Sequence, residues 1–178
     1  MSSSPARKLG SWLACMVLAL GAIAAADAPR KAQPFTYQDI NPNSPSHGKR
    51  LSLPKLYAER GVVLNFLASW CDYCWKELPD LDRLRQSKSA PIVGVAADEY
   101  GDVGPLRELL VRSRSTMPVL LVPKAEIEAM SEAYDHRVLP ATYLIDRLGR
   151  ILRVYQGLAP VAELSARIDS ELVSAPSP

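Results

Sequence analysis

The sequence predicts one α/β domain in which helices flank a central mixed β-sheet. Two short apolar runs, residues 61–68 and 91–97, are each followed by apolar side chains at helical spacing, a pattern typical of strand–helix alternation. Further on, residues 141–155 contain two apolar runs joined by a short turn, which indicates an antiparallel hairpin. A chain of 178 residues has the length of about one domain, and the sequence indicates neither an internal repeat nor a second domain.

The first 26 residues have the pattern of an export signal. Arg7 and Lys8 precede an almost uncharged apolar run over residues 9–26, and the three alanines that end this run would provide a cleavage site before Asp27. A run of 18 residues is also the lower limit for a helix that spans a bilayer, so a retained N-terminal membrane anchor is the alternative. With either outcome, we expect the domain to work outside the cytoplasm, in the periplasm or a similar extracytoplasmic space.

The charge and the cysteine content limit the classes of function that the domain can have. Cys15 lies inside the apolar run, so the domain itself contains two cysteines, Cys71 and Cys74. Without Arg7 and Lys8 the chain carries 19 basic and 19 acidic residues, and its formal charge is zero. A basic surface that binds nucleic acid is therefore not expected.

The expected elements follow in order along the chain. Residues 27–50 are rich in Pro, Asn and Ser, and we expect them to form a linker or irregular lead-in to a folded domain over residues 51–173. The run 61–68 is dominated by Val, Leu and Phe, as in a strand buried on both faces. Beyond the cysteines, apolar residues lie along one side of a helix, at Trp75, Leu78, Leu81 and Leu84.

The second half of the chain continues the alternation. Its expected elements are a strand over 91–97, a helix over 104–114, an apolar run over 117–122, a helix over 125–134, hairpin strands over 141–146 and 151–155, and a helix over 160–172. Pro160 is well placed to begin the last helix, because proline is favoured in the first helical turn. Residues 174–178 are expected to be a disordered tail.

The motif Cys71-Asp72-Tyr73-Cys74 lies between the first predicted strand and its helix. At a helix N-terminus, free backbone N–H groups and the helix dipole favour the thiolate of the first cysteine, so Cys71 is the expected nucleophile. Cys74, one turn further along, would attack a mixed disulfide that involves Cys71. A static disulfide and half of a zinc site are the alternatives, although His47 and His136 show no metal-ligand spacing and we expect no metal.

Two segments around these elements resemble one protein family. Residues 64–79 (LNFLASWCDYCWKELP) are similar to the active-site strand and helix of the TlpA/ResA-like branch of the thioredoxin superfamily. Residues 138–146 (VLPATYLID) resemble that family's cis-proline loop and the strand after it. The resemblance implies a thioredoxin-like fold and thiol:disulfide exchange on exported proteins, with the cysteine pair as the redox centre and no separate cofactor.

The resemblance also implies roles for single residues. Trp70 is similar to the tryptophan that flanks the reactive thiol and shapes the docking surface, which Asp72 and Tyr73 would extend. Pro140 matches the cis-proline, whose preceding residue, here Leu139, would pair through its backbone with a client strand. Glu77 resembles an acidic residue that receives or relays the proton of the buried thiol, and a solvated helix carboxylate is the alternative.

We expect electrons to flow from this protein to its clients. The Asp72 carboxylate should disfavour the Cys71 thiolate, and a less stabilised reduced form makes a more reducing protein. The clients would be exported proteins with disulfides, such as apocytochromes c or copper-site proteins, and the electron donor a membrane thiol transporter. An oxidase or isomerase of folding proteins is one alternative. Another is a copper-binding module that uses Cys71, Cys74 and His136.

Overall fold

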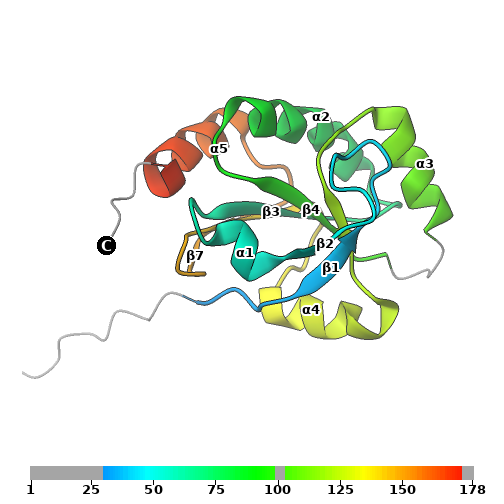
Figure 1. The fold of residues 1–178 in the computed structure, drawn as a ribbon, viewed down its shortest axis with the longest axis horizontal. Coiled ribbons are helices and arrows are strands. Elements are labelled where there is room, and N and C mark those ends of the chain that lie inside the picture. The colour runs from blue at the N-terminus through cyan, green and yellow to red at the C-terminus, as the bar shows by residue number, and fades with distance from the viewer. Residues whose placement is uncertain (1–29, 99–102, 174–178) are drawn as a thin grey trace, which may run out of the picture.

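The computed structural model describes residues 30–98 and 103–173, and within these ranges seven strands form one mixed sheet (Figure 1). The strand order across the sheet is β2-β1-β5-β4-β3-β6-β7. The strands are β1 (Thr36–Asp39), β2 (Arg50–Ser52), β3 (Val62–Leu67), β4 (Ile92–Ala96), β5 (Val119–Leu121), β6 (Ala141–Ile145) and β7 (Ile151–Gln156). The mixed α/β class predicted from the sequence is confirmed.

Helices connect and cover these strands. They are α1 (Leu53–Tyr57), α2 (Asp72–Ser87), α3 (Gly104–Ser113), a short turn η1 (Lys124–Glu126), α4 (Ile127–Tyr134), α5 (Val161–Arg167) and the wider-turned η2 (Ile168–Val173). Strands β3, β4 and β5 run parallel because α2 and α3 carry the chain back between them, whereas β6 pairs antiparallel with both β3 and β7. The predicted strand–helix alternation and the hairpin are therefore present.

The core consists of two apolar layers, one on each face of the sheet. Helices α2, α3 and α5 cover one face, and α1 and α4 cover the other (Figure 1). Strand β3 is buried along its whole length, since both of its faces meet helices. This central position gives the chain that leaves β3 a rigid starting point.

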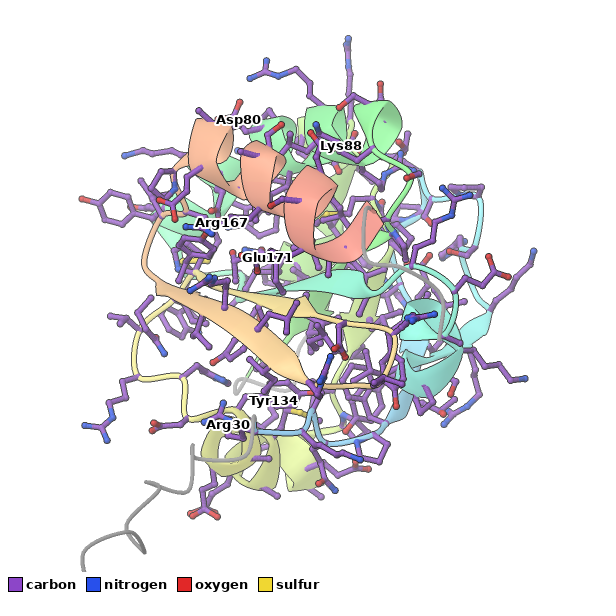
Figure 2. The ribbon with its side chains drawn as sticks, turned by 90° about the vertical axis from the view of Figure 1, so that its left-hand side faces the viewer. Arg30, Asp80, Lys88, Tyr134, Arg167 and Glu171 are labelled. Carbon is purple, nitrogen blue, oxygen red and sulfur yellow. A yellow bond between two sulfur atoms is a disulfide. The ribbon has the colours of Figure 1, made fainter. Side chains whose placement is uncertain are left out.

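Contacts between distant segments fasten both ends of the described chain. Arg30 donates a hydrogen bond of 2.6 Å to the carbonyl oxygen of Tyr134, at the end of α4 (Figure 2). At the other end, Lys88 forms an ion pair of 2.6 Å with Asp169 in η2. These contacts join the first described residues to α4 and the last helical segment to the end of α2.

The segment 27–50, expected to be a linker, differs from that expectation in the structure. Residues 36–39 form β1, which pairs with both β2 and β5. Pro34, Pro42 and Pro45 lie outside β1 and leave its ladder hydrogen bonds intact, and Tyr37 and Asp39 turn inward. Pro54 lies in the first turn of α1, where a backbone N–H has no partner within the helix, so the missing N–H of proline costs nothing.

Two predictions fall outside the described residues. The export signal or anchor over residues 1–26 and the tail over 174–178 remain predictions. Among the helices of the described ranges, none is both long and apolar enough to cross a membrane.

Candidate active site

The cysteine pair lies where β3 ends and α2 begins. Cys71 is the N-cap residue of α2, and Cys74 lies in its first turn. Their sulfur atoms form a disulfide, with the two Cα atoms 5.3 Å apart. The backbone N–H of Cys74 donates to the Cys71 sulfur over 3.2 Å, so the sulfur that we expect to react faces a helix N-terminus. Cys71 is 5% exposed and Cys74 2%, so both sulfurs are buried and Cys74 slightly more so.

The loop between β3 and α2 is held by three hydrogen bonds. The Ser69 N–H donates to the Asp98 carboxylate over 2.7 Å, and the Trp75 indole N–H donates to the Ser69 carbonyl over 3.0 Å. The Cys71 N–H donates to the carbonyl oxygen of Ala68 over 3.2 Å. Asp98 was not a candidate in the sequence, although it directly follows a predicted strand. The carboxyl ends of neighbouring parallel strands meet at one sheet edge, and that rule would have placed it near the motif.

Apolar side chains project around the disulfide. Trp70 and Tyr73 are 52% and 58% exposed, and the Lys76 ammonium lies 4.8 Å from the centre of the Tyr73 ring. Trp70 and Leu139 both line a small cavity of about 160 Å³, so the motif and the Pro140 loop lie side by side. The Leu139–Pro140 peptide bond is cis, as the resemblance implied. Asp72 is exposed on the first turn of α2.

Glu77 points into the protein and is 3% exposed. One carboxylate oxygen accepts the Ala159 N–H over 2.8 Å, and the other accepts the Asn65 side-chain amide over 2.9 Å. The same Asn65 nitrogen also donates to the Thr142 hydroxyl over 3.0 Å, while the Asn65 carbonyl oxygen is buried without a partner among the described residues. Burial raises the pKa of Glu77 and outweighs these hydrogen bonds, which lower it. The alternative of a solvated carboxylate is therefore wrong.

His136 lies near the Pro140 loop but is held in a structural contact. Its ring packs against Phe66 with 4.6 Å between the ring centres, and its Nε2 lies 3.3 Å from the Ser131 hydroxyl. Burial lowers the pKa of His136 and so favours the neutral imidazole. Within the described ranges, no three or more His, Cys, Asp or Glu side chains are grouped so that they could hold a metal ion.

Comparison with known proteins agrees with this geometry. Thiol-disulfide oxidoreductase ResA of Bacillus subtilis is 30% identical over 132 residues, which are 74% of this chain and 66% of ResA. ResA of Bacillus thuringiensis is 30% identical over 113 residues, 62% of each chain. The matched stretch therefore covers slightly less than two thirds of the length of these two relatives.

Solved structures share the fold. The thioredoxin domain of a thiol-disulfide oxidoreductase from Bacteroides vulgatus superposes with a TM-score of 0.67 at 21% identity, covering 82% of this chain and 98% of that domain. A secreted disulfide oxidoreductase of Mycobacterium tuberculosis, homologous to Escherichia coli DsbE, gives 0.59 at 20% identity, over 76% and 95% of the two chains. These likenesses confirm the thioredoxin-like fold. Since the model of the AhpC/TSA family matches residues 29–154, the chain belongs to that family.

Proposed function

We propose that this protein is an extracytoplasmic thiol:disulfide oxidoreductase that reduces disulfides in exported client proteins. The observation that carries the proposal is the disulfide between Cys71 and Cys74 at the N-terminus of α2, beside the Pro140 loop. The names of the ResA relatives support the reaction class. The description of the M. tuberculosis neighbour as secreted supports the location.

In the proposed reaction the protein begins with both cysteines reduced. The Cys71 thiolate attacks one sulfur of the client disulfide, and the other client sulfur leaves as a thiolate that takes up a proton. Cys74 then loses its proton and attacks the Cys71 sulfur, which releases the second client sulfur as a thiolate that takes up a proton in turn. The client gains two electrons and two protons, and the protein is left with the Cys71–Cys74 disulfide seen in the structure.

The surrounding side chains fit these steps. The first turn of α2 offers backbone N–H groups to the Cys71 thiolate, and exposed Trp70 and Tyr73 offer apolar surface to a client. The backbone of Leu139, which lines the same cavity as Trp70, would pair with a client strand. Glu77 lies one helical turn beyond Cys74 and would accept its proton, since a carboxyl group with a raised pKa is a better match for a thiol.

The proposed cycle needs an electron donor that restores the two thiols. A membrane thiol transporter is the donor class that we propose, because the cytosolic reductants are absent outside the cytoplasm. Residues 1–26 would either direct export and be removed or keep the domain at the membrane. Apocytochromes c and copper-site proteins are the client classes that we would examine first.

A trapping experiment tests the assignment. The Cys74→Ser variant should remain joined to its client through Cys71, and mass spectrometry of the captured complex would identify that client. Cys71→Ser is the matched control and should capture nothing. Capture by Cys71→Ser, or disulfide exchange that survives this change, would show that the nucleophile is assigned wrongly.

The direction of exchange is tested separately by the redox potential. A reductant should have a midpoint near that of thioredoxin, about −270 mV, and far from the roughly −120 mV of DsbA. Equilibration with dithiothreitol mixtures, followed by mass spectrometry of the alkylated Cys71 and Cys74 peptides, gives this value. A midpoint close to that of DsbA would favour an oxidase.

A further inference from the structure

A carboxylate outside the motif is hydrogen-bonded to the loop between β3 and α2. Asp98 follows β4 and is 4% exposed, and one of its oxygens accepts the Ser69 N–H over 2.7 Å. Its other oxygen is buried and has no hydrogen-bond partner among the described residues. A buried polar group is costly to stability unless it is hydrogen-bonded. Within the described part of the chain, the bond to the Ser69 N–H is therefore the contact that holds Asp98 against the loop between β3 and α2.

Both backbone polar groups of Ser69 are hydrogen-bonded. The Ser69 N–H is bound by Asp98, and the Ser69 carbonyl accepts the Trp75 indole N–H over 3.0 Å. Trp70 and Cys71 are the next two residues, and the Cys71 N–H is bound in turn to the carbonyl oxygen of Ala68. The position of the Cys71 sulfur thus depends on a short loop, residues 68–71, that is hydrogen-bonded to Asp98 through Ser69.

We propose that Asp98 is a positioning residue for the exchange site. By binding the Ser69 N–H, it holds the loop so that the Cys71 sulfur lies at the N-terminus of α2, where the Cys74 N–H reaches it over 3.2 Å. This inference rests on the proposed function, in which Cys71 is the nucleophile. Hydrogen bonds to a thiolate stabilise it only in the right geometry, so loosening the loop should make Cys71 less acidic and exchange slower.

Two substitutions separate the hydrogen bond from the charge. Asp98→Asn keeps an oxygen that can accept the Ser69 N–H and loses the charge, whereas Asp98→Ala loses both. We expect Asp98→Asn to retain the wild-type rate of disulfide exchange within about twofold, and Asp98→Ala to lose about tenfold, because small displacements of reacting groups are costly. Exchange is measured with a peptide that contains one disulfide.

The pH dependence of Cys71 alkylation gives a readout that a purely structural role would not change. In reduced protein, alkylation is followed by mass spectrometry, and fragmentation of the peptide 61–76, which contains Cys71 and Cys74, assigns the label to Cys71. Both variants lose the negative charge of Asp98, so the effect of that charge on the Cys71 pKa is the same in both. The two variants then differ in the hydrogen bond to the Ser69 N–H. The alkylation midpoint of Asp98→Ala should lie at least about half a pH unit above that of Asp98→Asn.

The outcomes distinguish the two proposals. If the wild-type protein exchanges disulfides while both variants match it in rate and midpoint, the positioning role is wrong, even if Asp98→Ala unfolds at a lower temperature. If the wild-type protein itself exchanges no disulfide, the proposed function fails. Should Asp98→Ala not fold, Asp98→Ser takes its place, since its shorter polar side chain leaves room for water, and the same results are expected of it.

Discussion

Replacing Glu77 by Gln tests how a buried charge behaves beneath the exchange motif. Glutamine keeps the shape of the side chain and an oxygen that can accept the Ala159 N–H. The amide nitrogen of the new glutamine would face the Asn65 side-chain nitrogen, and two donors cannot bond to each other. If the Asn65 amide rotates by 180°, its unpartnered oxygen faces the new amide nitrogen and accepts a hydrogen bond from it. The substitution therefore removes the charge while the contacts around it can be re-formed.

The sign of the expected effect follows from the raised pKa of Glu77. Below its ordinary value of 4.5, the carboxyl group is protonated in both folded and unfolded chains. As the pH rises, the unfolded chain ionises first, so the wild-type protein loses stability until the pH passes the folded pKa, by about 1.36 kcal/mol for each pH unit between the two values. Glutamine does not titrate. The free energy of unfolding of Glu77→Gln, relative to wild type, should therefore increase with pH and then level off.

Glu77→Ala should behave differently from Glu77→Gln. It removes the acceptor of the Ala159 N–H and of one Asn65 N–H, each buried. An unpaired buried donor costs about 1–3 kcal/mol, so we expect Glu77→Ala to lose about 2–6 kcal/mol at low pH, where wild-type Glu77 is uncharged.

Urea unfolding of the oxidised protein between pH 4 and pH 8, followed by circular dichroism, measures these differences. Glu108→Gln, which removes an exposed carboxylate from α3, is the matched control for a general change in net charge. A Glu77→Gln difference that stays constant with pH, or that shrinks as the pH rises, would refute the reasoning. A similar rise for Glu108→Gln would assign the effect to net charge.

Three further predictions concern other parts of the structure. Gly61→Ala should cost more than about 2 kcal/mol in urea unfolding, because φ is +74° and an added Cβ would lie 2.5 Å from the carbonyl oxygen of Ile145. Gly48→Ala, with φ of +79° and open space, should cost only about 1 kcal/mol. Trp70→Ala should slow reduction of a protein client about tenfold but leave that of glutathione disulfide unchanged, because exposed aromatic anchors act on large partners. Asp82→Ala should lower the unfolding free energy by about 2 kcal/mol, since this buried carboxylate accepts one backbone N–H and one arginine N–H at 3.0 Å each.

The strands and helices that the sequence predicted are those with a clear apolar period. Residues 61–68 are apolar at nearly every position because β3 is covered on both faces. Strand β1 was missed for a physical reason: one of its two inward side chains is Asp39, so the alternation is not apolar. In the structure, Asp39 is fully buried and accepts the N–H groups of Asn41 and Val119. Such a strand becomes visible only when its neighbours are known.

Residues of the candidate site that are close in sequence could also be predicted from their spacing, whereas those that only the fold brings together could not. Cys71, Cys74 and Glu77 lie on one helix, so their spacing alone predicted that they are close. Pro140 is distant in sequence and was placed by resemblance. Asp98 directly follows a predicted strand, but this position places it beside the motif only once β4 is known to lie next to β3, which is a property of the sheet order.

The two carboxylates closest to the thiols in sequence differ in their surroundings, and this changes the physical basis of the proposed reduction. Asp72 is exposed, so water and salt screen its effect on the Cys71 thiolate. Glu77 is buried, and its raised pKa reflects a low-dielectric setting in which charge acts strongly. In the proposed cycle the Cys74 proton must leave before the client is released. In the proposed cycle Glu77, as the acceptor of that proton, therefore has a larger part in disulfide exchange than Asp72.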